Sequence, residues 1–286
     1  MALFRIILRC LYGLEKIWSF VIFKLRGSLS QKIDVLHQSD NFLVINKGHD
    51  IVINSNDPLV AESLHSILSK LYPSLVNPKL RHYFHFVHRL DFVTSGVLCL
   101  ALNKKAASAA ALCFENRSAK KYYMALVRGH VSGEIIDIKA AIGECSSEKN
   151  GNHKMCVEDD AECLAPRTAF TRLLVLERGL FAAYPASKVL LRPVTGRRHQ
   201  IRVHCHYLGH TIVGDYTYSC GRDVNPDRTF LHALRLILPN AVEPLDIRTG
   251  DPFQNIDKTH GWIPVEKIND LQTAFTKIEN DISLNL

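Results

Sequence analysis

Short runs of β-branched and aromatic residues, each closed by a turn, recur along most of this chain of 286 residues. Runs of this kind predict β-strands. They lie at residues 33–37, 42–46, 97–102, 120–127, 170–176, 189–191 and 232–238. Many strands with few regular crossover helices between them predict an α+β fold around a largely antiparallel sheet.

Apolar residues recur at helical spacing in only a few stretches of the chain. Asn103 is a good N-cap for a helix at 104–115, which contains three consecutive alanines. The other expected helices are 59–71, stopped by Tyr72-Pro73, 198–208, ended by Gly209, and a terminal helix marked by Val265, Ile268, Leu271, Phe275 and Ile278. Residues 143–167 are polar, and we expect a long exposed loop there.

The composition is that of a folded protein, with 47% hydrophobic and 22% charged residues, so extensive disorder is excluded. The net charge of +7 favours a polyanionic partner such as RNA or DNA, although many proteins with other roles share a mild basic excess. None of the eight cysteines forms a C-x-x-C pair. They indicate free thiols in a reducing, intracellular compartment rather than a disulfide scaffold.

Residues 1–31 form a basic amphipathic extension, in which Glu15 is the only acid. Its uncharged stretches are too short for a transmembrane helix, and its charges interrupt any secretory signal. A mitochondrial presequence, an interfacial helix and a helix packed on the core all fit the segment. We therefore expect a cytoplasmic or mitochondrial protein with no stable membrane span. The body at 32–255 shows no repeat or linker and predicts one domain, followed by a helical tail at 256–286.

The first candidate site runs from His88 to Gly96. Asp91 is flanked by basic residues, lies at the edge of a buried strand and precedes a Thr-Ser-Gly turn. A nearby guanidinium lowers the pKa of a carboxylate and keeps it ionised, which suits a nucleophile or a base. The alternative is an aspartate that pairs with Arg89 and braces the turn.

The second candidate site is residues 195–204. In a helix that begins at Arg198, the side chains of Arg198 and Arg202 share one face at i,i+4 spacing. Cations at the start of a helix oppose its dipole, so an anion should compensate them. An RNA phosphate or a carboxylate such as that of Asp91 would serve. The alternative is a solvated basic face, although Ile201 and Val203 leave little of the segment exposed.

Together these stretches resemble the ordered sequence blocks of the RluA family of RNA pseudouridine synthases. The blocks are His88-Arg89-Leu90-Asp91 through Thr94-Ser95-Gly96 (HRLDxxTSG), Lys121-x-Tyr123-x-Ala125-Leu126-Val127-x-Gly129 (KxYxALVxG), Gly196-Arg197-x-His199-Gln200-Ile201-Arg202-Val203-His204 with Leu208-Gly209-His210-x-Ile212-x-Gly214-Asp215, and Leu231-His232-Ala233. They cover about residues 33–255.

The chain departs from the family pattern at a few positions. Arg198 stands where Thr or Ser is usual, and Thr211 stands in place of Pro. The opening Asn46-Lys47-Gly48 lacks the usual Pro after Lys47 and is more similar to the eukaryotic RNA pseudouridine synthase domain-containing branch. The chain leaves no room for the N-terminal S4 domain of some members, so we expect the catalytic domain at 32–255 to make the RNA contacts.

The resemblance implies a single α+β catalytic domain around a mixed, mainly antiparallel β-sheet with a central basic cleft. It implies isomerisation of uridine to pseudouridine in transfer, ribosomal or messenger RNA, without a cofactor or metal. Asp91 would attack the sugar or the base, Arg202 would pair with Asp91, and Tyr123 would stack on the uracil and help to remove its C5 proton. The residues implied to bind RNA are Arg89, Lys121, Arg197, Arg198, His199 and Gln200.

Three rival interpretations carry less weight. A metal site at His82, His85 and His88 requires a helix, whereas the aromatic residues between them favour an extended chain that turns alternate side chains to opposite faces. A catalytically silent RNA-binding relative would be expected to lose its acid, and Asp91 is present. A glycosidase-like enzyme needs a second carboxylate, and no second acid has a comparable sequence context.

Overall fold

The computed structural model describes residues 33–55, 62–146, 154–254 and 261–280. The N-terminal extension expected at 1–31 lies outside these residues, so its role and the cellular compartment stay predictions. Residues Val35–Leu286 group into one compact unit. None of the helices in the described ranges combines the length and the apolar character needed to cross a membrane.

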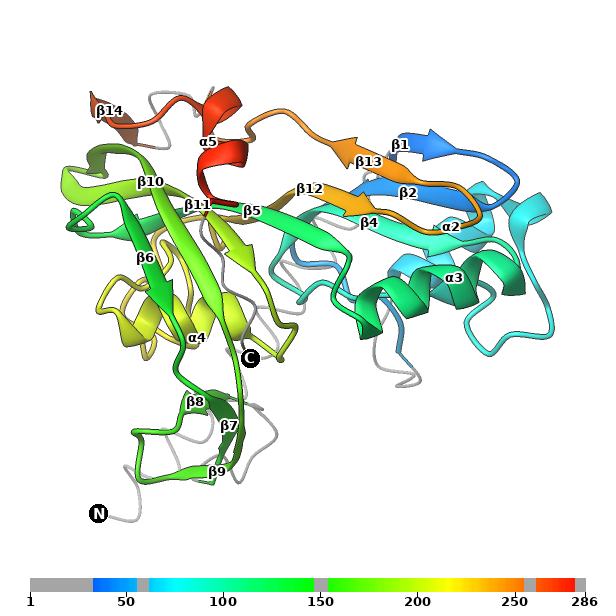
Figure 1. Ribbon diagram of the computed structural model, residues 1–286, viewed down its shortest axis with the longest axis horizontal. Coiled ribbons are helices and arrows are strands. Elements are labelled where there is room, and N and C mark those ends of the chain that lie inside the picture. The colour runs from blue at the N-terminus through cyan, green and yellow to red at the C-terminus, as the bar shows by residue number, and fades with distance from the viewer. Residues whose placement is uncertain (1–32, 56–61, 147–153, 255–260, 281–286) are drawn as a thin grey trace, which may run out of the picture. The chain divides into compact units, whose positions relative to one another are not determined.

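A mixed eleven-stranded sheet forms the centre of this unit (Figure 1). Its strands are β1 (Asp34–Gln38), β2 (Phe42–Lys47), β3 (His85–Phe86), β4 (Ser95–Ala101), β5 (Lys120–Arg128), β6 (Ile135–Ile138), β10 (Thr171–Phe181), β11 (Tyr184–Pro193), β12 (Leu231–Leu238), β13 (Leu245–Arg248) and β14 (Trp262–Lys267). The main path is β1-β2-β4-β12-β5-β11-β10-β14, with β3 on β4, β13 on β12 and β6 on β10. Among the pairs whose register is described, only β4 and β12 run parallel. The predicted α+β class with a mainly antiparallel sheet is confirmed.

Strand β4 is buried along its whole length because it lies between β2 and β12. The expected turn at Thr94-Ser95-Gly96 is wrong in part, since Ser95 and Gly96 already belong to this strand. Gly96 has a φ of 113°, and a Cβ atom there would lie 2.2 Å from the carbonyl oxygen of Ala233 on β12. Only glycine therefore allows the parallel contact between β4 and β12, directly after the loop that carries Asp91.

Successive side chains of the central strands point to opposite faces of the sheet, so the core has two layers. Tyr122, Met124 and Leu126 of β5 pack with helix α5 (Leu271–Lys277), whereas Ala125 and Val127 pack on the opposite face with helix α4 (Gln200–Tyr207). Figure 1 shows α5 above the sheet and α4 below it. A third helix, α3 (Lys104–Glu115), packs its alanines against β2 and β4. The α4 face of β5 also carries the candidate site.

Two helices begin later than expected. Helix α2 (Leu64–Leu71) starts after Ser63, whose side chain and that of Ser66 form a capping box, and a short 3₁₀ helix at Pro73–Leu75 follows it. Helix α4 starts at Gln200 because His199 adopts a left-handed conformation with a φ of 52°. Arg198 therefore lies outside the helix, and the expected i,i+4 face shared with Arg202 is wrong.

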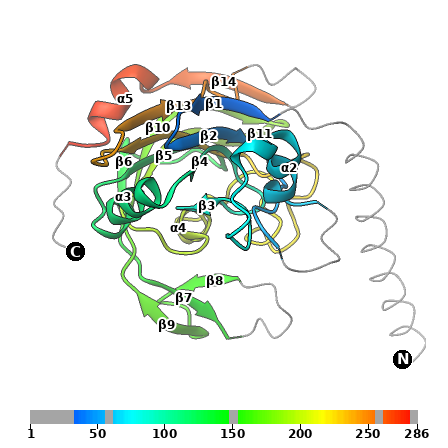
Figure 2. The ribbon, with the colours of Figure 1, turned by 90° about the vertical axis from the view of Figure 1, so that its right-hand side faces the viewer.

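The polar segment 143–167, expected to be an exposed loop, instead contributes to a small three-stranded sheet (Figure 2). The strands are β7 (Ile142–Cys145), β8 (Met155–Val157) and β9 (Cys163–Arg167), in the order β8-β7-β9. Ile142 and Met155 pack against Val203 of α4 and Tyr218. This tertiary packing, rather than strong strand propensity, accounts for the sheet.

The segment after residue 255 is not helical throughout. Strand β14 joins the edge of the main sheet by pairing with β10, so Val265 lies in a strand and not in the expected terminal helix. Helix α5 begins after Asp270, whose side chain accepts a hydrogen bond from the backbone nitrogen of Gln272. Phe275 and Ile278 then bury themselves in the core, which attaches this segment to the catalytic body.

Candidate active site

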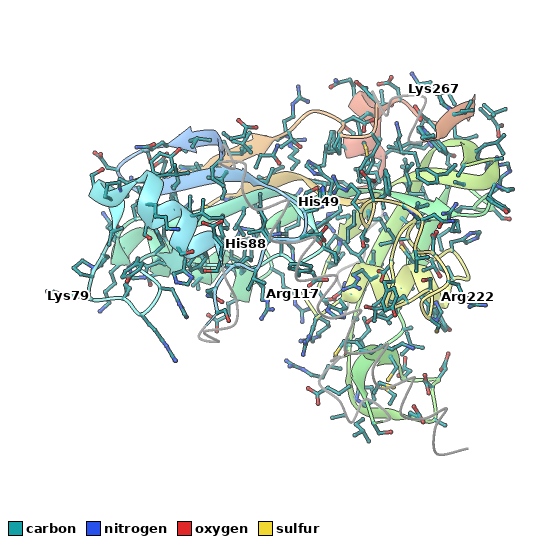
Figure 3. All side chains as sticks on the ribbon, turned by 180° about the vertical axis from the view of Figure 1, so that it is seen from behind. His49, Lys79, His88, Arg117, Arg222 and Lys267 are labelled. Carbon is teal, nitrogen blue, oxygen red and sulfur yellow. The ribbon has the colours of Figure 1, made fainter. Side chains whose placement is uncertain are left out.

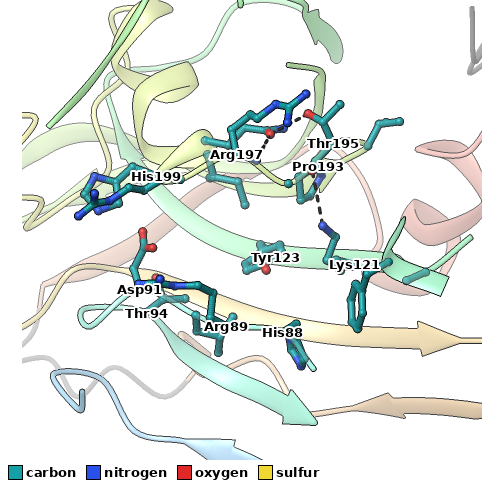
Figure 4. Close-up of a pocket in the computed structure, with 18 of the residues that line it drawn as sticks. His88, Arg89, Asp91, Thr94, Lys121, Tyr123, Pro193, Thr195, Arg197 and His199 are labelled. Carbon is teal, nitrogen blue, oxygen red and sulfur yellow. Dashed lines mark hydrogen bonds between the residues drawn. The ribbon is translucent and has the colours of Figure 1, made fainter. Parts of the chain in front are cut away.

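A cavity of about 650 Å³ opens where the β3–β4 loop, strand β5 and the start of α4 meet (Figure 4). All the residues predicted from the sequence line it: Asp91, Tyr123, Arg202, Arg89, Lys121, Arg197, Arg198, His199 and Gln200. They come from three separate segments, at residues 89–91, 121–123 and 197–202, and the fold brings every one of them to the same cavity.

Asp91 lies in the loop between β3 and β4. Its carbonyl oxygen accepts a hydrogen bond from the backbone nitrogen of Thr94, which closes a turn. The ammonium group of Lys47, at the end of β2, donates to the carbonyl oxygens of Thr94 at 2.8 Å and Phe92 at 3.1 Å, and it lies 3.4 Å from that of Asp91. Burial lowers the pKa of Lys47 to about 7. The buried side chain of Lys47 thus holds the backbone of the loop, and the carboxylate of Asp91 is directed into the cavity (Figure 4).

Arg202 of α4 connects Asp91 to a second acid, Asp215. Its Nε and Nη2 atoms donate to the two carboxylate oxygens of Asp215 at 2.7 and 2.9 Å, while its Nη1 lies 3.5 Å from Oδ2 of Asp91. Burial works against the charge of Arg202, but its hydrogen bonds to Asp215 and the charges of both acids raise its pKa above the usual value. The guanidinium therefore stays charged and places a fixed positive charge beside the carboxylate of Asp91.

Tyr218 contacts both members of the ion pair between Arg202 and Asp215. Its ring lies 5.1 Å from the guanidinium carbon of Arg202, and its backbone nitrogen donates to Asp215. Its hydroxyl oxygen accepts from the backbone nitrogen of Met155 in the small sheet and lies 3.1 Å from Nδ1 of His199. Burial lowers the pKa of His199 to about 4, so this ring is neutral at pH 7.

Strand β5 forms the floor of the cavity with Lys121 and Tyr123, which point to the same face because they are two residues apart (Figure 4). Burial, and then the negative charge of Asp91, raises the pKa of the Tyr123 hydroxyl, which therefore stays protonated at neutral pH. Burial and the nearby charge of Arg192 lower the pKa of Lys121 to about 8. The Nζ atom of Lys121 has a single weak contact, 3.5 Å from the carbonyl oxygen of Thr195.

The remaining predicted residues differ in what they offer a ligand. Arg89 and Arg198 are exposed, and Arg197 is half-buried with its Nε atom donating to the carbonyl oxygen of Thr168. Gln200 is buried, and its amide is fully used inside the protein. Its oxygen accepts from Thr195 Oγ1 and the backbone nitrogen of Arg197, and its nitrogen donates to two acceptors on residues 170 and 171. Gln200 therefore shapes the loop before α4.

Sequence reasoning assigned no role to three residues that organise the site: Asp215, Tyr218 and Lys47. Asp215 and Lys47 do lie inside the blocks Gly214-Asp215 and Asn46-Lys47-Gly48, which was the available signal. Nothing in the sequence around Tyr218 distinguishes it from a core aromatic residue. In the described part of the chain no group of three or more His, Cys, Asp or Glu side chains is arranged to hold a metal ion.

A carboxylate held beside a buried guanidinium, in a cavity rimmed by arginines, is the arrangement expected of an active site that receives a polyanion. The family model for RNA pseudouridylate synthase matches residues 41–207. This match covers more than half of the chain. The chain belongs to the RNA pseudouridylate synthase family, and it is an isomerase of that class.

Individual relatives agree with this assignment. RNA pseudouridylate synthase domain-containing protein 1 from Mus musculus is 46% identical over 258 residues, which cover 89% of this chain and 83% of the relative. The dual-specificity RNA pseudouridine synthase RluA from Pasteurella multocida is 34% identical over 209 residues, or 71% of this chain and 85% of the relative. The solved structure of human RNA pseudouridylate synthase domain containing 1 superposes with a TM-score of 0.77 at 40% identity, covering 88% of this chain and 96% of that one. The expected resemblance to the RluA family and to its eukaryotic branch is confirmed.

Proposed function

We propose that this enzyme converts specific uridines in RNA to pseudouridine, with Asp91 as the nucleophile and with the target nucleotide extruded from its stack. The observation that carries the proposal is the 3.5 Å contact between the Asp91 carboxylate and Arg202, in a cavity that all the predicted site residues line. A carboxylate that lies beside a fixed cation and is still open to a ligand has the properties of a nucleophile.

The position of Asp91 supports base extrusion. Its carboxylate is partly buried, with 22% of the side chain exposed, inside a cavity whose floor is strand β5. A uridine that remains stacked in RNA cannot reach this depth, so the nucleotide must leave the stack at a cost of a few kcal/mol. The exposed arginines Arg89 and Arg198, together with Arg197, offset that cost through contacts with phosphates.

The reaction breaks the bond between C1′ of the ribose and N1 of uracil and forms a bond between C1′ and C5. The proton leaves C5 and a proton is taken up at N1, so no electrons are gained or lost. Asp91 attacks the sugar or the base, and Arg202 holds a positive charge beside the attacking carboxylate. Tyr123 offers its ring face to the uracil. Its hydroxyl is already protonated, so it takes up the C5 proton only as it passes its own proton on, toward N1 or solvent.

The substrate of this proposal is an RNA chain: transfer, ribosomal or messenger RNA. Phosphates are held by Arg89, Arg197 and Arg198 at the mouth, and Lys121 places a further cation at the floor. The neutral ring of His199 lies beside the entering nucleotide, and Gln200 keeps Arg197 in place through its backbone. Contacts of this kind position the RNA without reading its sequence.

The decisive experiment measures tritium release from total RNA labelled at C5 of uridine, using the wild type and Asp91→Asn. We expect release by the wild type and none by Asp91→Asn, with RNA affinity of the variant within a few-fold of wild type. Turnover by Asp91→Asn would remove Asp91 as the nucleophile. Binding without release by the wild type, in every RNA pool, would instead indicate an RNA-binding relative that has lost catalysis.

A further inference from the structure

Three arginines from separate segments meet at the edge of the cavity that faces the small sheet. Arg117 follows the last turn of α3 (Figure 3), Arg167 ends β9, and Arg197 precedes α4. Arg117 and Arg197 both line the cavity. The Nε atom of Arg197 donates to the carbonyl oxygen of Thr168 at 3.0 Å, on the residue next to Arg167. The small sheet and the loop before α4 are thereby joined at this point.

The three side chains form a cluster of like charge. Burial, followed by the positive charges of Arg167 and then Arg117, lowers the pKa of Arg197, so the three guanidinium groups lie within electrostatic reach of one another. None of them takes part in an ion pair among the described residues. Arg117 and Arg167 are exposed and Arg197 is half-buried, so a ligand can reach all three. The buried or half-buried arginines that do have an acidic partner in the same part of the chain are Arg128, Arg172, Arg178, Arg192, Arg202 and Arg235.

The backbone turns at Arg117. Arg117 has a φ of 61°, a left-handed conformation that is uncommon for any residue with a side chain. It follows the C-cap Asn116 and so occupies the position at which a left-handed residue commonly ends a helix. Such a conformation directs the chain away from the helix axis at the cavity wall. Convergent unpaired cations cost free energy in the absence of an anion, and a bound anion offsets it.

We propose that Arg117, Arg167 and Arg197 form a phosphate subsite for the RNA backbone beside the extruded uridine, so that the strand leaves the cavity along the small sheet β7–β8–β9. The inference rests on the proposed function and extends it, because it gives the RNA a direction across the protein. Guanidinium groups match phosphate through paired N–H donors, which favours this ligand over a single carboxylate.

The subsite predicts a specific effect of charge removal. Arg117→Gln and Arg167→Gln should each weaken binding of a short fluorescein-labelled oligouridine about tenfold, as expected for the loss of a charge-assisted hydrogen bond. The slope of log affinity against log salt should fall by about 0.7 for each phosphate that the variant no longer neutralises. Arg248→Gln is the matched control, because Arg248 is exposed on β13 and does not line the cavity.

Activity separates this inference from the proposed function. With RNA labelled at C5, both variants should raise KM and leave kcat at saturating RNA within about twofold of wild type, since neither residue touches Asp91. Melting temperatures equal to wild type would exclude misfolding as the cause. The subsite is wrong if Arg117→Gln and Arg167→Gln bind oligouridine as tightly as Arg248→Gln. The proposed function fails on a different result, namely no tritium release by the wild type.

Discussion

At the scale of single residues, Asp215 determines how much of Arg202 is available to Asp91. Two nitrogens of the guanidinium are bound by Asp215 at 2.7 and 2.9 Å, and only Nη1 approaches Asp91, at 3.5 Å. A bidentate pair between Arg202 and Asp91 would have tied up both oxygens of the acid. Because Asp215 takes that place, Asp91 keeps the benefit of a positive charge and retains an oxygen for the substrate.

Replacing Asp215 by Asn tests whether Asp215 keeps Arg202 from forming a bidentate pair with Asp91. The substitution preserves shape but removes the charge that holds Arg202, and breaking a buried ion pair costs about 3 kcal/mol of stability. Arg202 would then be free to turn toward Asp91. We expect kcat to fall on the order of a hundredfold, because small displacements of reacting groups have effects of this size. Single-turnover tritium release, at a temperature where the variant is folded, measures this fall in the rate.

Asp223→Asn provides a matched comparison. Asp223 binds Arg128 through two hydrogen bonds at 2.8 and 2.6 Å, but neither residue lines the cavity. This variant should lose stability and keep the kcat of wild type. Equal loss of kcat in both variants would mean that Asp215 acts through general stability rather than through Arg202.

The same residue scale shows a limit of sequence reasoning. The resemblance identified Asp91, Tyr123 and Arg202, and the structure gathers them in one cavity. From the basic residues before α4 we expected a compensating anion, either the carboxylate of Asp91 or an RNA phosphate. The principal partner of Arg202 is Asp215, and this pairing depends on the path of the chain between α4 and β12, which no periodic pattern encodes.

At the scale of elements, the loop between β3 and β4 is attached to the sheet by the side chain of Lys47. This ammonium group donates to carbonyl oxygens on both sides of the turn, including that of Thr94 at 2.8 Å. Lys47 itself pairs with Gly96 in the register of β2 and β4, so its side chain starts from a fixed point of the sheet. The strand thereby determines where the Asp91 loop lies.

Lys47→Met should release this loop. Methionine keeps the apolar stem but leaves buried carbonyl oxygens without a donor, at a cost of about 1–3 kcal/mol each. We expect a lower kcat with little change in RNA affinity, because the rim arginines are untouched. Lys188→Met is the control: Lys188 is equally buried and pairs with Glu177 and Asp251, away from the cavity. If Lys188→Met lowers kcat as much as Lys47→Met, the loop is not held by Lys47 in the way proposed.

Elements differ in how far their sequences determine them. Helix α3 was predicted from Lys104 to Glu115 and is found there, because its alanines favour a helix and Asn103 accepts a hydrogen bond from Ala106 at its start. The small sheet was missed because its strands are short and polar. They are stabilised by packing of Ile142 and Met155 on Tyr218, which no local pattern encodes.

At the scale of the whole molecule, the sequence predicted the class of the sheet but not its order. Short strands and few helices were enough to predict a mainly antiparallel α+β fold. The parallel contact of β4 with β12 joins segments that are far apart in the chain, and it depends on the absence of a side chain at Gly96. This contact positions the Asp91 loop beside β5, and therefore the two halves of the sheet must associate before the site exists.

The folded molecule also buries neutral histidines, which makes its stability depend on pH. Burial lowers the pKa of His88 to about 3, of His199 to about 4 and of His232 to about 3. Well above pH 6.5 these rings are neutral in both the folded and the unfolded chain, so they do not make the free energy of unfolding depend on pH. As the pH falls from about 6.5 toward 4, the unfolded chain binds protons that the folded chain does not, so the free energy of unfolding decreases by up to about 1.4 kcal/mol per pH unit for each histidine. Urea unfolding at a series of pH values measures this slope. His88→Gln, whose amide oxygen can still accept from the backbone nitrogen of Cys99, should reduce it by the contribution of one histidine, up to about 1.4 kcal/mol per pH unit. An unchanged slope in His88→Gln would show that carboxylates, and not buried histidines, dominate the acid sensitivity of the fold.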